Sequence, residues 1–457
     1  MEVSAKLARF IVETGFDEIP PDAIAAAKRA ILDTLGVALS GTREQSAKIV
    51  AKVVANLGGQ PSASLFGAPL RTSPSNAALA NGVMAHALDY DDDIGVGYGH
   101  PSAVIVPTVL ALGEALGRSG REVIEAYVLG VEVWLKIARA MPRLHTLGWH
   151  PTGIFGALGA AVAASKLMRL DVDQTTMVLG LGGSHAAGLI QNLGTMAKPF
   201  HAGNAARGGI IAAMLVSEGL TATREVLEGN FGLPAALCGT GATDPASMVE
   251  DLGAPFAVVR PGINVKRYPC YYSAHKCIDA VLHLIDEFDF EPDDVISVHC
   301  LVPDRVTKIL FHTSPQTGLE AKFSMQFFMA AAIIDRGLRL AQFTDAKVND
   351  ARIRGLMKRV TMSEHRIMEG SDIPLDHPDA VTVTLKGGKQ ISHAVAIAKG
   401  HADNPLTKAE LLGKYGECAG LVMHEEDVAR LGDILAGLDK LADVKELTRL
   451  LRTRPSC

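Results

Sequence analysis

Two histidines precede prolines in apolar surroundings, and both are candidates for proton transfer. His100 precedes Pro101 and His150 precedes Pro151, and an apolar helical pattern follows each pair. Because proline suits the first turn of a helix, each histidine is predicted to lie at a helix N-terminus. The positive end of a helix disfavours imidazolium and keeps the imidazole neutral. Each is therefore a candidate general base, the alternative being a histidine that only caps its helix.

Lys198 is the second unusual residue, since it is the only Asp, Glu, Lys or Arg between Asp173 and Arg207. A lone lysine in an apolar, glycine-rich stretch must find an anion or lose its proton. Together with His201 and the amides of a helix predicted to start at Pro199, it suggests a site for a carboxylate. The alternative is a surface lysine between two buried helices.

An acidic run at residues 89–93 follows His86. A divalent-metal site of the kind found in helical prenyl or terpene synthases needs two adjacent carboxylates and a third one helical turn later. The nearly consecutive aspartates do not fit that spacing, so no metal site is predicted. We expect Asp89 or a neighbouring aspartate to orient His100, as carboxylates orient catalytic imidazoles. The alternative is a solvated helix end.

A basic, tyrosine-rich segment lies near the point where the sequence pattern changes. Lys266 and Arg267 are adjacent, and tyrosines follow at positions 268, 271 and 272. Adjacent cations suit the recognition of polycarboxylates, and ligand clefts tend to form at domain boundaries. The alternative is a basic linker.

The elements that must position these residues are mostly helices. Helical periodicity predicts helices from Pro21 to near Gly41 and over 42–57, 73–88 and 120–141, with closely packed Gly/Ala-rich helices at 153–164 and 179–188. Further on, strands are predicted at 256–259, 295–301 and 360–362, helices at 273–288, 320–334 and 347–358, and a hairpin at 380–385 and 389–397. Helices return at 408–412 and 425–451.

These patterns predict a mainly α fold with two domains. A large all-helical domain would combine residues 1–262 and 404–457, and a smaller α+β domain would occupy 263–403. The stretch 174–197 has the length of a membrane span but contains His185, Gln191 and several glycines. A buried helix pair is expected there, and no membrane segment.

Composition excludes several classes of protein. The 457 residues are 48% hydrophobic and 21% charged, which is typical of a globular protein. A net charge of −6 makes nucleic acid a poor partner. Six cysteines without a CxxC pair argue against a disulfide framework, a clustered zinc site or an iron–sulfur cluster. The N-terminus shows no signal-peptide pattern, so a cytoplasmic protein is expected.

Seven short motifs occur in order along nearly the whole chain. They lie at residues 33–36, 81–92, 100–102, 149–153, 198–206, 266–269 and 320–324. In these motifs the chain resembles the MmgE/PrpD family, which includes 2-methylcitrate dehydratase, cis-aconitate decarboxylase and iminodisuccinate epimerase. The resemblance implies an all-helical domain with an α+β lid, a homodimer, and a site between the two domains that uses no metal or organic cofactor.

The resemblance also implies which residues act. By motif, the catalytic positions fall on Asp89, His100, His150, Lys198 and Lys266. Lyase members carry a histidine a few residues after the second lysine. This chain has Tyr271 in that place, and its nearest histidine is His275.

The reactions of the family all build negative charge next to a carboxylate, and one set of residues can serve each of them. Lysine and histidine cations would hold the substrate's carboxylates and stabilise the enolate-like species; the residues expected to bind substrate are Lys198, His201, Lys266 and Arg267. Neutral His150 would remove or return the carbon-bound proton. Tyr271 would supply an acid on the opposite face, the alternative being a tyrosine that packs beside Tyr272.

We therefore expect a lyase that acts on a small di- or tricarboxylate by proton abstraction, with dehydration of the 2-methylcitrate type as the first choice. An epimerase or isomerase comes next, and a decarboxylase of cis-aconitate third. A carboxylate-binding protein without catalysis is the non-enzyme alternative.

Overall fold

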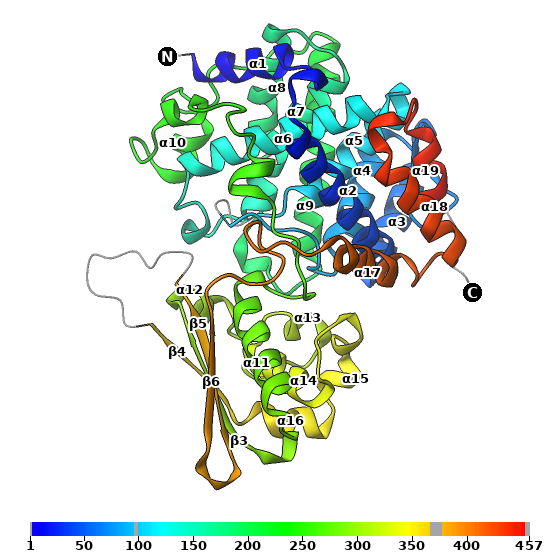
Figure 1. Ribbon diagram of the computed structural model, residues 1–457. Coiled ribbons are helices and arrows are strands. Elements are labelled where there is room, and N and C mark those ends of the chain that lie inside the picture. The colour runs from blue at the N-terminus through cyan, green and yellow to red at the C-terminus, as the bar shows by residue number, and fades with distance from the viewer. Residues whose placement is uncertain (1, 96–98, 366–376, 453–457) are drawn as a thin grey trace. The chain divides into compact units, whose positions relative to one another are not determined.

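The computed structural model describes residues 2–95, 99–365 and 377–452. The chain divides into two compact units. The first contains Met1–Val265 and Thr407–Cys457, and the second contains Lys266–Leu406. Both chain ends therefore belong to the first unit, and helices dominate the fold (Figure 1). None of the helices in the described part of the chain combines the length and apolar character needed to cross a bilayer.

The first unit is a bundle of helices. Its N-terminal part comprises α1 (Val3–Glu13), α2 (Pro21–Gly41), α3 (Gln45–Leu57), α4 (Pro74–His86), α5 (Ser102–Leu116), α6 (Gly120–Ala140), α7 (Pro151–Leu167), α8 (Val172–His185), α9 (Ala197–Ser217) and α10 (Leu233–Cys238). Its C-terminal part comprises α17 (Lys408–Ala419), α18 (Glu425–Ala436) and α19 (Lys445–Leu451).

Local signals place several helix starts where the sequence predicts them. Pro21 occupies the first turn of α2, and Ser119 caps α6 in a capping box with Glu122. The predicted helices at 21–41, 42–57, 73–88 and 120–141 are thus confirmed to within a few residues. The region 174–197 differs from expectation, because only its first half is a helix, α8, before the chain turns into irregular structure.

Glycines let the helices that carry the candidate residues approach closely. A Cβ on Gly82 of α4 would lie 2.7 Å from the Cα of Gly203 in α9, and a Cβ on Gly203 would lie 2.2 Å from the carbonyl oxygen of Leu79. No side chain larger than hydrogen fits at this crossing. The C-terminal end of α4 is thereby held against the N-terminal part of α9.

The expectation that the first domain is all-helical is wrong in one detail. Strands β1 (Ala63–Ser64) and β2 (Arg71–Thr72) pair antiparallel in the first unit. Buried groups hold this short ribbon: the Glu114 carboxylate accepts hydrogen bonds from the Ser64 amide at 2.7 Å and from its hydroxyl at 2.8 Å. Two-residue strands stabilised by side chains from distant helices leave no periodic signal in the sequence.

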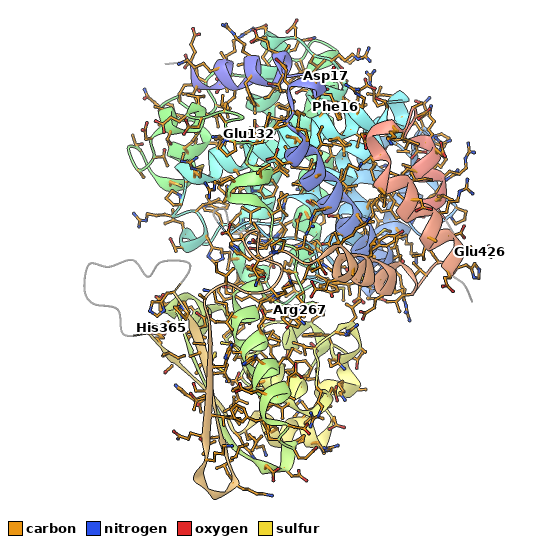
Figure 2. The ribbon with its side chains drawn as sticks, viewed as in Figure 1. Phe16, Asp17, Glu132, Arg267, His365 and Glu426 are labelled. Atoms are coloured by element: carbon orange, nitrogen blue, oxygen red, sulfur yellow. The ribbon has the colours of Figure 1, made fainter. Side chains whose placement is uncertain are left out.

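The predicted strand at 256–259 is also wrong. This segment leads into a helical turn at Val258–Gly262. The buried carboxylate of Glu132 on α6 accepts hydrogen bonds from the amides of Gly253 at 3.0 Å and Ala257 at 2.5 Å (Glu132 is labelled in Figure 2). Because the Ala257 amide bonds to a side chain, it has no place in a strand ladder.

The second unit is α+β. Its four-stranded sheet has the order β4 (Val360–Glu364), β3 (Val295–Val302), β5 (Asp379–Leu385), β6 (Gln390–Val395), where β3 and β4 are parallel and the other pairs antiparallel. Its helices are α11 (His275–Phe288), α12 (Asp304–Ile309), α13 (Gly318–Ala321), α14 (Met325–Asp335), α15 (Asp345–Val348) and α16 (Ala351–Met357). Figure 1 shows α11 and α14 on one face of the sheet, in agreement with their contacts.

The sheet strands and the hairpin are confirmed, but three long predicted helices are interrupted. Residues 320–334 form α13 and α14, and residues 347–358 belong to α15 and α16. Ser324 and Asp350 accept hydrogen bonds from backbone amides at the starts of α14 and α16, so each begins a new helix. Residues 425–451 divide into α18 and α19.

Candidate active site

Five basic side chains from distant parts of the sequence come together in the first unit. His86 ends α4, His100 lies just before α5, His150 is the N-cap of α7, and Lys198 and His201 lie in the first turns of α9. All five are at least nine-tenths buried. The predicted placement of the two proline-preceding histidines at helix N-termini is confirmed.

The N-termini of α5, α7 and α9 are associated with this cluster, and α7 packs against both of the other helices. Helix N-termini carry partial positive charge and unbonded amides, which favour anions and disfavour additional cations. His150 forms no side-chain capping bond of its own. This region is therefore suited to a ligand with negative charge.

His150 and His201 face each other, with their Nδ1 atoms 2.9 Å apart. One of these nitrogens must carry the hydrogen and the other must accept it, so the two neutral rings adopt opposite tautomers. Burial and then the neighbouring His86 lower the pKa of His150 well below its ordinary value. Burial, followed by His86 and Lys198, lowers the pKa of His201 to about 4. Both rings are neutral at pH 7, the state that a general base needs.

Gly188 is a part of this arrangement that the sequence reasoning missed. Its φ of 144° lies in a region that favours glycine, and a Cβ here would be 3.2 Å from Cγ of His201. Its carbonyl accepts a hydrogen bond from the His150 amide at 3.0 Å. The segment after α8 thus holds the backbone of His150 while leaving room for the ring of His201.

Lys198 forms a buried ion pair with Asp89. Nζ lies 2.7 Å from Oδ1, and the two side chains are 8% and 5% exposed. Asp89 has a φ of 53°, which aspartate tolerates better than most residues. Of the two outcomes expected for a lone lysine, an anionic partner or loss of its proton, Lys198 has the first, and the partner is Asp89 of the same chain.

The rest of the acidic run orients the histidines. The Asp91 carboxylate lies 2.8 Å from Nδ1 of His86 and 3.4 Å from Nδ1 of His100. Nδ1 of His100 also donates a hydrogen bond to the Asp92 carbonyl oxygen at 2.7 Å. The sequence left open whether Asp89 or a neighbouring aspartate orients His100. In the structure, Asp91 and Asp92 contact His100.

The carboxyl group of Asp92 contacts Ser102, the first residue of α5. It accepts hydrogen bonds from the Ser102 amide at 3.2 Å and from the Ser102 hydroxyl, whose oxygen lies 2.6 Å from the Tyr127 hydroxyl. Burial raises the pKa of Asp92 well above its ordinary value. This network fixes the backbone that holds His100.

Lys414 of α17 supports the same segment from the C-terminal part of the unit. Its Nζ lies 2.7 Å from Oδ1 of Asp33 and donates a hydrogen bond to the Tyr90 carbonyl oxygen at 2.8 Å. Helix α17 therefore holds the acidic segment through this backbone hydrogen bond, and the charge of Lys414 is paired with Asp33 of α2.

One set of residues has the composition of a metal site. Potential ligand atoms of His86, Asp91 and His100 lie within 4.8 Å of one another. Nδ1 of His100 carries a hydrogen, because the Asp92 carbonyl can only accept. A cation bound through that nitrogen would have to displace this hydrogen bond.

Comparison with known proteins identifies the family. Residues 5–245 match the MmgE/PrpD N-terminal domain, and residues 268–440 match the MmgE/PrpD C-terminal domain. The chain belongs to the MmgE/PrpD family.

Relatives within the MmgE/PrpD family are similar over almost their full length. The chain is 30% identical to cis-aconitate decarboxylase of Homo sapiens, covering 94% of this chain and 90% of that protein. It is 25% identical to cis-aconitate decarboxylase of Aspergillus terreus, covering 98% and 96%. The family-level activity is that of a lyase.

The remaining predicted residues lie in or next to the region that matches the MmgE/PrpD C-terminal domain. Lys266 begins the second unit. Arg267, labelled in Figure 2, is paired with Asp279 at 3.2 Å, and the Tyr268 hydroxyl bonds to the same carboxylate at 2.6 Å. Tyr271 is half-buried, and its ring centroid lies 6.3 Å from that of Phe323.

Proposed function

We propose that this member of the MmgE/PrpD family is a lyase that acts on a small di- or tricarboxylate by proton abstraction next to a carboxylate, without a metal or organic cofactor. The observation that carries the proposal is the cluster of buried imidazoles around the Asp89–Lys198 pair at three helix N-termini. It combines neutral bases with an environment that attracts anions.

In this proposal His150 moves the carbon-bound proton. It is neutral at pH 7 and hydrogen-bonded to His201, which helps to hold its ring. Lys198, which pairs with Asp89, is proposed to bind a substrate carboxylate as well. His100, held by Asp91 and Asp92, is the second acid/base residue. Lys266 and Arg267 are proposed to bind further carboxylates of the substrate.

Cis-aconitate is the first substrate to test, because the relatives similar over nearly the whole chain are named as its decarboxylases. That reaction removes carbon dioxide and protonates carbon. Dehydration of a 2-methylcitrate-like hydroxy acid uses the same base and needs an acid for the leaving hydroxyl, so it remains in the proposal. Both steps pass through negative charge next to a carboxylate, which a cation can stabilise.

Epimerisation of a dicarboxylate is the second candidate, and Tyr271 favours it. A phenol, with an unperturbed pKa near 10, is a weak base at neutral pH but a usable proton donor. An acid and a base on opposite faces of one carbon suit an epimerase. Replacing Tyr271 by Phe tests this role, since only the hydroxyl is lost.

A substrate screen in deuterated water tests the proposed function. Cis-aconitate, hydroxy tricarboxylates and amino- or iminodicarboxylates are incubated with the purified chain, and products and deuterium at carbon are followed by NMR and mass spectrometry. We expect product formation or deuterium exchange with at least one carboxylate, and neither with Lys198→Met. Absence of both with every compound would contradict enzymatic function and leave the carboxylate-binding alternative, which binding measurements would then test.

The same assay distinguishes the reactions. Release of carbon dioxide from cis-aconitate identifies a decarboxylase, and loss of water from a hydroxy acid identifies a dehydratase. A tenfold or greater loss of turnover in Tyr271→Phe with exchange retained would make Tyr271 the acid. Loss of both turnover and exchange would instead place it in substrate binding, and an unchanged rate would leave it a packing residue.

A further inference from the structure

The two ring nitrogens of His86 have different environments. Nδ1 lies 2.8 Å from Oδ2 of Asp91, and both side chains are 0% exposed. Nε2 is buried and has no hydrogen-bond partner within the described part of the chain. One end of this imidazole is thus held by Asp91, and the nitrogen at the other end has no hydrogen-bond partner among the described residues.

The contact with Asp91 fixes the tautomer of His86. An ionised carboxylate only accepts hydrogen bonds, so Nδ1 carries the hydrogen and Nε2 carries the lone pair. A buried acceptor without a donor destabilises the folded chain. A bound ligand that donates a hydrogen bond to this nitrogen would remove this destabilisation.

The surroundings of His86 are those of the candidate active site. Its ring centroid lies 4.5 Å from that of His100 and 6.0 Å from that of His150, nearly parallel to the latter. The charged groups that act on it are Asp91, Lys198 and Asp89, from the segment after α4 and from α9. In the sequence, His86 is distinguished only by its position before the acidic run.

We propose that His86, oriented by Asp91, is a further proton-accepting residue of this site, whose Nε2 accepts a hydrogen bond or a proton from a hydroxyl group of a bound hydroxy polycarboxylate. In a proton transfer the ligand oxygen keeps the bonding electron pair, the Nε2 lone pair forms the new N–H bond, and Asp91 stabilises the imidazolium. The inference rests on the proposed function, since it assigns a contact to the same ligand.

The Asp91–His86 pair resembles the carboxylate–histidine pairs in which the histidine acts as an acid or base. The partner fixes the ring and its tautomer, and its negative charge favours protonation at the far nitrogen. Burial, the largest influence, lowers the pKa of His86, whereas Asp91 raises it and Lys198 lowers it. Removing the charge of Asp91 must therefore lower the pKa of His86 further.

Histidine NMR on the full chain reads the two ring nitrogens directly. With ¹⁵N-labelled histidine, and with His86→Gln for assignment, we expect the Nδ1–H tautomer of His86 at pH 7. Saturation with citrate, a hydroxy tricarboxylate, should move the Nε2 resonance toward the protonated range, whereas tricarballylate, which lacks the hydroxyl, should not. An Nε2–H tautomer, or an unchanged His86 resonance when citrate is demonstrably bound, would overturn the proposal.

Kinetics separate a chemical role from a structural one. His86→Gln should lower kcat/KM at least about tenfold while the melting temperature shows a folded chain. Asp91→Asn should move the acidic limb of the kcat/KM profile to lower pH, and this shift should vanish in His86→Gln/Asp91→Asn. The control is His424→Gln, which changes the exposed N-cap residue of α18.

The outcomes keep this inference separate from the proposed function. A wild-type chain that turns over a carboxylate, with an acidic limb that Asp91→Asn does not move, would refute the role of His86 alone. A wild-type chain that neither binds nor converts any carboxylate would refute the proposed function, and the role of His86 with it. Activity that a chelator abolishes and zinc restores would assign His86, Asp91 and His100 to a metal and overturn the proposal.

Discussion

A histidine that removes a proton from carbon near neutral pH must be neutral, and this chain achieves that by burying its imidazoles among like charges. His86, His150 and His201 all have lowered pKa values, with burial as the largest cause and nearby Lys198 as a further one. The ion pair with Asp89 compensates the charge of Lys198. The cluster can thus contain several bases without several positive charges.

His150 is predicted to be the principal acid/base residue. His150→Ala should lower kcat by about a hundred- to thousandfold with the fold retained, because general acid/base catalysis contributes on this scale. Steady-state kinetics and circular dichroism measure the two effects. A variant that keeps more than about a tenth of the wild-type activity would show that another residue moves the proton.

The lowered pKa of His201 also predicts how stability depends on pH. The pKa is about 4 in the folded chain, against an ordinary value of 6.5. Since the unfolded chain binds the proton more readily, this contribution is fully present above about pH 6.5 and is lost as the pH falls toward about 4. Urea unfolding at pH 7 and pH 5 should show a smaller loss of stability for His201→Asn than for the wild type. Equal losses would contradict the assignment, and His424→Asn serves as the exposed control.

At the scale of elements, the site depends on how closely α4 and α9 cross. His86 lies at the end of α4, and Lys198 and His201 lie in the first turns of α9. Gly82 and Gly203 allow the backbones of α4 and α9 to touch where the two helices cross, close to these three basic residues in the sequence. Helix packing at this crossing, rather than any local motif, decides the distances among the basic side chains.

Gly203→Ala is predicted to destabilise the chain and to lower activity. The new Cβ would lie 2.2 Å from the Leu79 carbonyl oxygen, so the helices must separate. Overpacking of this kind costs about 1–3 kcal/mol. The matched control is Gly413→Ala in α17, where a Cβ meets nothing within 4 Å, and which should be neutral or stabilising by about 0.5–1 kcal/mol. Thermal melting and kinetics check both variants, and equal melting temperatures for the two would contradict the argument.

At the scale of the whole molecule, the chain joins two units, and the match to the C-terminal family domain, residues 268–440, extends past the second unit into α17 and α18 of the first. The first unit contains the imidazole cluster, and Lys266, Arg267 and Tyr271 lie in the second. The second unit is inserted between α10 and α17 of the first, so the C-terminal helices return to complete the helical bundle. Lys414 shows why that return matters, since it reaches the acidic segment near the site.

The oligomeric state is predicted to be a homodimer, as the resemblance to the family implies. Symmetric dimers are the commonest assemblies of soluble chains. Light scattering at several protein concentrations should give a mass about twice that of the 48.2 kDa chain. A monomer mass across the micromolar range would contradict this prediction, and the substrate screen would then be interpreted for a monomer.

The family, the mainly helical fold and the residues worth testing could all be predicted from the order of residues along the chain. Proline after His100 and His150 predicted helix starts, because the ring of proline acts on its immediate neighbours. A lone lysine in an apolar stretch predicted a buried charge in need of an anion. These inferences succeeded because each depends on residues adjacent in the chain.

Only the tertiary structure decided which side chains meet. It paired Lys198 with Asp89, placed Asp91 between His86 and His100, and showed why residue 188 is a glycine. It also replaced a predicted strand at 256–259 by a turn that Glu132 holds. These contacts join residues far apart in the chain, and helix packing sets their geometry. Periodicity along the sequence carries no record of such packing, which is why the chemistry could be anticipated by residue type but its arrangement could not.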